Sequence, residues 1–273
     1  MKKVAVVTGA SSGIGEATVK KFLQEGYEVY AAARRLDRMT GLADLGARPI
    51  SLDLTDDPSI VAAVERIRAE AGRIDVLVNN AGYGSYGAVE DVPLDEARRQ
   101  FEVNLFGAAR LIQLALPMMR AQKSGKIVNV SSIGGRFGEP FGAWYHATKY
   151  ALEGLSDSLR MELRPFGIDV IIIEPGAIRT EWGPIAHHSM LAMSGDTAYA
   201  VHARRHARIH ELAANSTMPS PPETVADEIS RTVVATRPRA RYPIGGGARL
   251  LLFVNRVLSE RLVYSLALRM AKG

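Results

Sequence analysis

The 273-residue sequence contains no cysteine. This absence excludes disulfide bonds, zinc sites with thiolate ligands and cysteine nucleophiles. The sequence also lacks any uninterrupted apolar stretch of about 18 residues, the length that a transmembrane helix needs. Its first residues, MKKVAVVTGASSG, hold too short an apolar run for a secretory signal peptide. We therefore expect a cytoplasmic protein with no transmembrane segment.

A large excess of charge of one sign is also missing, because 34 lysines and arginines face 29 acidic residues and leave a net charge of +5. Proteins that bind nucleic acid usually carry a denser basic surface, so we expect no nucleic-acid partner. The apolar content of 47% and the charged content of 23% are those of an ordinary globular protein. An α/β chain of this length commonly forms one core, and we expect a single domain over residues 1–273.

Short apolar runs rich in valine and isoleucine alternate with longer helical patterns. The runs are nearly continuous, as in strands covered on both faces, and they span residues 4–7, 29–33, 49–52, 76–78, 126–130 and 170–173. Helical patterns between them include residues 16–25, 59–71, 95–120 and 145–166. This alternation predicts an α/β fold of the Rossmann type, a doubly wound parallel sheet with helices on both faces.

The pattern changes after about residue 182. Residues 183–220 show weak periodicity, a helix is predicted over 223–236, and residues 237–247 form an irregular segment ending in three glycines. The last stretch, 248–270, is apolar and helical. We predict a cofactor-binding and catalytic core at 1–182, and a substrate lid with C-terminal helices at 183–273. The final helix can lie on a membrane surface, but its arginines interrupt the apolar face and favour packing against the pocket or a partner subunit.

A glycine-rich turn follows the first apolar run, with the sequence TGASSGIG at residues 8–15. In a dinucleotide-binding turn, Gly9 would allow the tight turn, Gly13 the close approach of a pyrophosphate, and Gly15 the packing of helix on strand. The phosphates would then meet free N–H groups at the start of the helix. Because the pattern directly follows the first predicted strand, this interpretation is favoured over an ordinary turn that is rich in glycine.

Two arginines, Arg34 and Arg35, follow the second apolar run. An acidic residue near this place would accept the 2′-hydroxyl of an NAD ribose, but alanine precedes the two arginines here and Asp37 comes late. Guanidinium groups suit a 2′-phosphate through charge-assisted hydrogen bonds. The pattern therefore favours NADP(H) over NAD(H), the alternative being that both arginines are simple surface charges.

Five motifs stand in one order along the chain: TGxxxGxG at 8–15, NNAG at 79–82, Ser132, YxxxK at Tyr145 and Lys149, and PGxIxT at 175–180. Together they make residues 1–182 resemble the short-chain dehydrogenase/reductase family. The residue chemistry agrees independently. Tyr145 and Lys149 lie one helical turn apart, so that the ammonium can lower the pKa of the phenol, and Ser132 follows a strand and can hydrogen-bond a substrate oxygen.

The resemblance implies hydride transfer between C4 of a nicotinamide and a carbinol or carbonyl carbon. Tyr145 would exchange the hydroxyl proton, Ser132 would orient and polarise the oxygen, and Lys149 would tune Tyr145 and bind the ribose. Asn104 would be the fourth catalytic residue, which kinks its helix and holds a water that connects to Lys149. Asn104 alternatively is a plain amide on a helix surface.

The cofactor-binding residues expected from the motifs and the resemblance are Gly9, Ser11, Ser12, Gly13, Ile14, Gly15, Arg34, Arg35, Asp53, Leu54, Asn80, Ala81, Gly82, Tyr145, Lys149, Pro175, Gly176, Ile178 and Thr180. By resemblance, Asp53 would contact the adenine, while Ile178 and Thr180 would contact the carboxamide. Asp53 fits nearly as well as a turn or helix-capping residue.

We expect no metal site. His202, His206 and His210 recur at four-residue spacing, but there is no HExxH motif and no acid clearly placed as a third ligand. A contact in an amphipathic lid or between subunits is the favoured role for these histidines. His146 is expected to point away from Tyr145, because adjacent residues of a helix do not share a face.

The predicted reaction is the oxidation of a secondary alcohol or the reduction of a ketone, on a bulky, apolar, steroid- or retinoid-like small molecule. This substrate class is suggested by similarity to hydroxysteroid and retinol dehydrogenases, carried by Met190, Leu191, Met193 and Tyr199 in the lid, by Phe137, Phe141 and Trp144, and by Arg241, Tyr242 and Pro243. The alternatives are a reductase of 3-oxoacyl thioesters and an NADP-binding redox sensor without turnover. Related enzymes also suggest a homodimer or homotetramer formed through helices 95–120 and 145–166.

Overall fold

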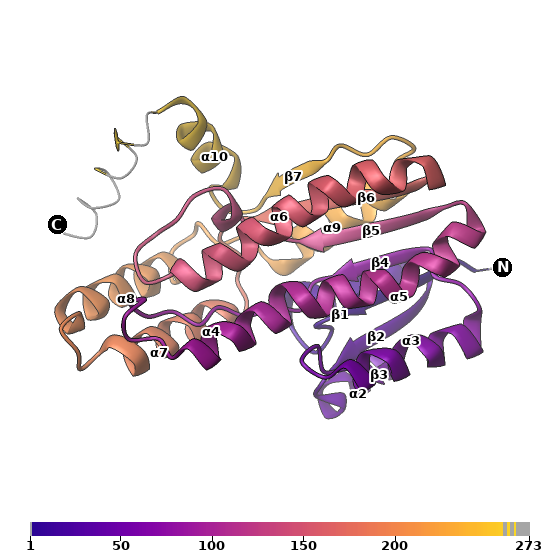
Figure 1. Cartoon of the computed structure of the whole chain (residues 1–273), viewed down its shortest axis with the longest axis horizontal. Helices are drawn as coiled ribbons and strands as arrows, with labels where there is room; N and C mark the ends of the chain where they lie inside the picture. Colours follow the sequence, from indigo (N-terminus) through magenta and orange to yellow (C-terminus); the bar gives the residue numbers. More distant parts are fainter. Residues whose placement is uncertain (1, 259–260, 263–264, 266–273) are drawn as a thin grey trace.

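The computed structural model describes residues 2–258, 261, 262 and 265 (Figure 1). Seven parallel strands form one sheet in the order β3-β2-β1-β4-β5-β6-β7. The strands are β1 (Val4–Thr8), β2 (Glu28–Ala33), β3 (Arg48–Ser51), β4 (Val76–Asn79), β5 (Gly125–Val130), β6 (Ile168–Pro175) and β7 (Arg241–Ile244). The strand order reverses between β1 and β4, and ligands of such sheets bind at this point, beyond the carboxyl ends of the strands.

Helices cover both faces of the sheet. Alternate residues of β1 point to opposite sides, so that Val4 and Val6 join one core cluster while Ala5 and Val7 join the other. The first cluster includes α3 (Asp57–Ala71), α5 (Gly107–Gln122) and α6 (Ala143–Leu163), and the second includes α1 (Gly13–Gln24), α2 (Thr40–Asp44) and α9 (Pro222–Val234). The predicted doubly wound Rossmann-type fold is confirmed.

All six predicted strands are present, with ends that differ by at most two residues from the apolar runs. The seventh strand, β7, was missed because its four residues include an arginine and a proline, which weaken the apolar signal in segment 237–247. It is the edge strand, paired only with β6 among the described strands. Arg241 fixes it to α6 through ion pairs with Glu153 at 2.9 Å and Asp157 at 2.6 Å.

The predicted helix 95–120 is interrupted. A π-helical segment, Glu102–Phe106, separates α4 (Leu94–Phe101) from α5. This segment contains Asn104, the residue at which the family resemblance implied a kink. π-helical turns of this kind often lie at functional sites.

The predicted lid contains two helices, α7 (Trp182–Ser194) and α8 (Ala200–Ala214), which lie next to each other beyond the carboxyl end of the sheet (Figure 1). A third core cluster joins Ala186 and Met190 of α7, and Ala203 and Ala207 of α8, to Tyr86 and Tyr145. The two ends of the lid segment lie side by side. Ile178 bridges to Ser220, and the Arg179 amide donates to the Ser220 carbonyl oxygen at 2.9 Å.

The final predicted helix is described over α10 (Ala248–Val257), while most of its remainder lies outside the described residues. Asn255 attaches α10 to the carbonyl oxygen of Arg136 at 3.0 Å. Leu250 and Phe253 are exposed, by 66% and 62%, so these two apolar side chains do not pack against the part of the chain that the structure describes. No helix among the described residues is both long and apolar enough to cross a membrane.

Candidate active site

The turn between β1 and α1 requires glycine. Gly9 and Gly13 have φ angles of 66° and 56°, in the left-handed region that side chains disfavour. A Cβ atom at Gly15 would lie 2.3 Å from the carbonyl oxygen of Gly9, so a side chain there would push the turn apart. The turn therefore leaves a cradle of backbone at the start of α1, which fits the pyrophosphate of a dinucleotide.

Thr8 connects this turn to the end of β4. Its Oγ1 accepts hydrogen bonds from the backbone amides of Asn80 and Ala81, both at 3.0 Å, and the Asn80 side chain donates to the Thr8 carbonyl oxygen at 2.9 Å. The NNAG segment is thereby held beside the glycine turn. A Cβ atom at Gly82 would lie 3.1 Å from Asn104 Oδ1 and 3.7 Å from Lys149 Nζ, so this segment also reaches the predicted catalytic residues.

Three of the predicted catalytic side chains come from β5 and α6. Tyr145 and Lys149 are buried on α6, and Lys149 Nζ lies 5.9 Å from the centre of the Tyr145 ring. Lys149 donates a hydrogen bond to the Val130 carbonyl oxygen at 2.9 Å, at the end of β5. Ser132 follows β5 and accepts a hydrogen bond from the amide of Gly134 at 3.0 Å. The fold brings the three side chains together as the motif spacing predicts.

Burial shifts the pKa values of both titratable groups. It raises the pKa of Tyr145 to about 12, with a hydrogen bond to Ser132 acting in the opposite direction. It lowers the pKa of Lys149 to about 8, against the charge of Glu153. The expected lowering of the Tyr145 pKa by Lys149 is not found, because burial dominates and the charge of Glu139 also raises this pKa. At neutral pH Tyr145 is a neutral phenol that can donate a proton, and Lys149 is predominantly an ammonium.

Asn104 is buried in the π-helical segment, with every polar atom of its side chain engaged. Its Nδ2 donates to the Tyr83 carbonyl oxygen at 2.9 Å and to Thr148 Oγ1 at 3.1 Å, and its Oδ1 accepts from the Tyr83 amide at 3.0 Å. The alternative of a helix-surface amide is therefore wrong. Asn104 joins the segment after β4 to α6 at the residue before Lys149.

Basic side chains lie at the end of β2, where the cofactor preference was predicted. Arg34 and Arg35 are exposed, and Arg35 donates to Ser11 Oγ in the glycine turn at 3.3 Å. The sequence analysis missed Arg38, which forms an ion pair of 3.0 Å with Glu181 at the start of the lid. Arg35 lies 3.8 Å from the same carboxylate.

The remaining predicted cofactor residues divide into two groups. Asp53 Oδ1 accepts hydrogen bonds from the amide and hydroxyl of Thr55, at 2.9 Å and 2.8 Å. This is the turn role that the sequence analysis gave as the alternative for Asp53. Leu54 is buried in the core. Thr180, by contrast, lies against the glycine turn, since a Cβ atom at Gly13 would be 3.0 Å from its methyl group. The other residues of 175–180 continue from β6 toward that turn.

Aromatic rings surround the Tyr145 side chain. The ring of Trp182 lies 5.0 Å from it and that of Tyr86 5.9 Å, between centroids. Phe141 also packs on this third cluster, together with Leu191, as expected for residues close to the site. The motif spacing could not reveal Tyr86 or Trp182, because they reach Tyr145 from separate loops and helices.

Arg241, Tyr242 and Pro243, which contributed to the predicted substrate class, belong to β7, and Arg241 pairs with Glu153 of α6. Two predictions about the surroundings are corrected. His146 does not point away from the site: its Nδ1 bonds the Gly134 carbonyl oxygen at 2.8 Å and its ring centre lies 5.6 Å from that of Tyr145.

The second correction concerns the acid judged missing beside the lid histidines. Glu139, in the segment before α6, approaches His206 and His210, with distances of 3.9 Å and 3.4 Å from its Oε2 to their Nε2 atoms. Glu139 could not be recognised from the sequence as a partner of these histidines, because about 70 residues separate them and only the folded chain brings α8 against that segment.

Comparison with known proteins gives the same assignment as the motifs. The family model described as short chain dehydrogenase matches residues 3–187. The chain is 36% identical over 257 residues to a probable short-chain type dehydrogenase/reductase, VdlC, of Helicobacter pylori, covering 93% of each protein. It is also 36% identical over 258 residues to an NADPH-dependent 3-dehydrocapnine reductase of Ornithobacterium rhinotracheale, covering 89% of this chain and 88% of that protein.

A solved structure agrees over the whole chain. A short-chain dehydrogenase from Streptomyces avermitilis superposes with a TM-score of 0.82 at 35% identity, covering 98% of both chains. The matching motifs, sheet order and relatives agree with one another, and the protein is an oxidoreductase that belongs to the short-chain dehydrogenase family.

Proposed function

We propose that the protein is an NADP(H)-dependent oxidoreductase that interconverts a ketone and a secondary alcohol. The observation that carries this proposal is that buried Tyr145 and Lys149 and half-buried Ser132 lie close together near the glycine turn. The bound nicotinamide would supply or accept the hydride at its C4 atom. The glycine turn, the NNAG segment and Thr180 are the residues proposed to hold this cofactor.

The residues of the chain supply the proton and the orientation. In the direction of reduction, the neutral phenol of Tyr145 donates its proton to the carbonyl oxygen of the substrate as negative charge develops there. Ser132 donates a hydrogen bond to the same oxygen and orients it. The ammonium of Lys149 stabilises the phenolate that remains, and Asn104 positions α6 at this turn through Thr148.

The surroundings of Tyr145 favour a bulky, apolar substrate. Phe141, Trp182 and Leu191, which are only partly buried, form an aromatic and aliphatic surface over the cluster that contains Tyr145. Such a surface gains free energy from burial of a large apolar molecule and offers little to a small polar one. We propose a steroid- or retinoid-like molecule with one polar oxygen as the substrate class.

A substrate panel tests this function. Purified protein with NADPH is incubated with steroid ketones, retinoid carbonyls, small polar ketones and a 3-oxoacyl thioester, and the absorbance of the reduced nicotinamide is followed. We expect the highest kcat/KM for the bulky apolar carbonyls. Turnover confined to small polar ketones or to the thioester would overturn the substrate class. Binding of NADPH without turnover of any member would favour a redox sensor.

The cofactor preference rests on Arg34 and Arg35 and is supported by the NADPH-dependent relative. Replacing both by alanine is expected to weaken NADPH binding by about 10-fold or more, because charge-assisted hydrogen bonds to the 2′-phosphate are lost. NADH binding should change little. Fluorescence titration of both cofactors measures the two affinities. The control is Arg98→Ala, which removes an exposed arginine paired with Asp95 on α4; an equal loss for both cofactors would contradict the assignment.

A further inference from the structure

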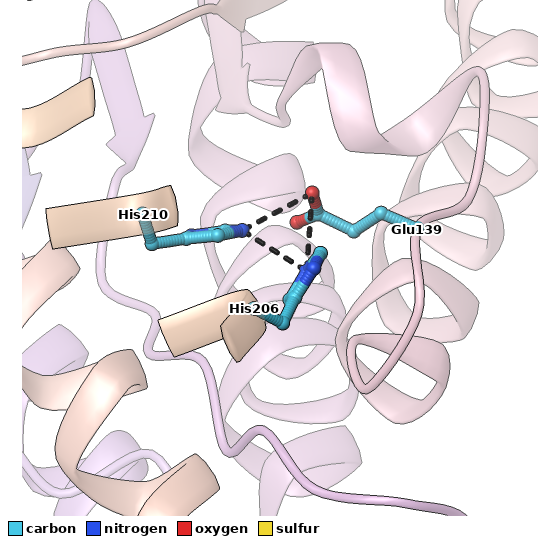
Figure 2. Close-up of side chains that lie close together, drawn as sticks. All are labelled: Glu139, His206 and His210. Atoms are coloured by element: carbon cyan, nitrogen blue, oxygen red, sulfur yellow. Dashed lines mark hydrogen bonds and ion pairs between the residues drawn. The ribbon is translucent and has the colours of Figure 1, made fainter. Parts of the chain in front are cut away.

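Glu139, His206 and His210 converge where α8 of the lid meets the segment that precedes α6 (Figure 2). The two imidazoles are one helical turn apart, and their Nε2 atoms lie 3.2 Å from each other. Glu139 Oε2 is 3.4 Å from His210 Nε2 and 3.9 Å from His206 Nε2. Among the residues that the structure describes, this is the one group with three side chains arranged to hold a metal ion.

The three distances suit one shared metal ion. A triangle with these sides has a point about 2.0 Å from each corner, and zinc bonds to histidine nitrogen and carboxylate oxygen have that length. Two histidines with one glutamate are also a common set of protein ligands for zinc, which then keeps a fourth position for water. A tetrahedral ion lies outside the plane of the three atoms, so its binding would shorten the 3.9 Å distance between Glu139 Oε2 and His206 Nε2 by about 0.5 Å, a small movement of the side chains.

Further contacts hold the carboxylate in place. The buried Tyr86 hydroxyl donates to Glu139 Oε1 at 2.8 Å, which leaves Oε2 directed at the two histidines. The amide of Glu139 donates to His146 Nε2 at 3.2 Å. Hydrogen bonds of this kind fix the orientation of metal ligands and raise their affinity.

The backbone beside Glu139 is strained. Phe141 has a φ angle of 65°, which is unfavourable for a bulky side chain and must be maintained by the surrounding structure. The ring of Phe141 packs on His206, with 5.7 Å between the centroids. A bond between this segment and α8 would help to hold that conformation.

We propose that Glu139, His206 and His210 bind a zinc ion that attaches lid helix α8 to the segment leading into the catalytic helix α6. Zinc is the first choice among divalent metals because it accepts imidazole and carboxylate ligands with three protein bonds. The site is separate from the proposed cofactor site, and neither the cofactor nor its chemistry is needed for the ion to bind.

The test uses the untagged full-length protein, stripped with a chelator, and zinc alone as the probe. Competition with a chromophoric chelator gives the affinity and stoichiometry, and we expect one ion per chain. Zinc at about 100 times its Kd should raise the melting temperature by about 5 °C or more, since the ion binds the folded state preferentially. Cobalt in place of zinc should give the visible absorption of a low-symmetry site.

Variants separate this site from adventitious binding. His206→Gln and His210→Gln should each lower the zinc affinity about 100-fold or more, because even an outer hydrogen-bond partner is worth 10- to 100-fold. His202→Gln is the matched control, an exposed histidine on the same helix whose loss should leave binding unchanged. Equal zinc affinity in the wild type and the three variants, or no thermal shift of the wild type with zinc, would overturn the proposal.

Discussion

Replacing Tyr145 by phenylalanine should lower kcat for ketone reduction by about 1,000-fold, while NADPH still binds. The phenol is proposed as the proton donor to the substrate oxygen, and general acid catalysis contributes about 10²- to 10⁴-fold. Phenylalanine keeps the ring that packs against Trp182 and Tyr86, so the fold and the apolar surface should remain. Steady-state kinetics on the best carbonyl of the panel, with a cofactor titration, measures both quantities.

The control for this variant is Tyr150→Phe, which removes a hydroxyl from a half-exposed side chain on the same helix. It should leave kcat unchanged. The proposal that Tyr145 is the acid would be contradicted if Tyr145→Phe retained more than about a tenth of the wild-type kcat, since that loss is smaller than general acid catalysis accounts for.

Replacing Lys149 by methionine should abolish most activity and at the same time stabilise the protein. Lys149 is buried, and its pKa is lowered from 10.5 to about 8 chiefly by desolvation. Such a shift corresponds to about 3 kcal/mol of folding free energy that the charged lysine costs. Methionine has a similar length and no charge, so it removes this cost, which exceeds the roughly 1 kcal/mol of the lost hydrogen bond to the Val130 carbonyl oxygen. It cannot stabilise the Tyr145 phenolate or bind a ribose.

The lowered pKa of Lys149 also determines how the stability difference changes with pH. The folded chain binds the Lys149 proton less tightly than the unfolded chain, so the cost is complete below about pH 8 and disappears as the pH approaches 10.5. The stability advantage of Lys149→Met should be largest at neutral pH and shrink above pH 8. Chemical denaturation at several pH values measures it. Lys20→Met, an exposed lysine paired with Glu16, is the control, and a strongly destabilised Lys149→Met would contradict the argument.

The central strands and the motifs could be predicted from the sequence because their signals are local. Continuous apolar runs mark strands buried on both faces, and glycine is required within the turn that follows β1. Tyr145 and Lys149 are placed together by helical spacing alone. These features depend on neighbours a few residues away, so one sequence is sufficient to find them.

The rest depends on contacts between distant parts of the chain. Glu139 meets the histidines of α8 only after the lid has packed, and Tyr86 reaches Tyr145 from a loop after β4. The pKa of Tyr145 depends on how completely the folded protein excludes water, which spacing along a helix does not reveal. Strand β7 was missed because its place in the sheet comes from pairing with β6, and its own composition is a weak signal.

The bridge between Ile178 and Ser220 has a consequence for how such a protein can diverge. These residues stand at the two ends of the lid segment, just beyond the sheet, so both ends are held side by side. Residues after the lid complete the sheet through β7 and its cover through α9. The lid is therefore a continuous insertion whose first and last residues lie next to each other. Evolution, or a protein engineer, can exchange that one continuous cassette for another of different length and leave the sheet and its glycine turn intact.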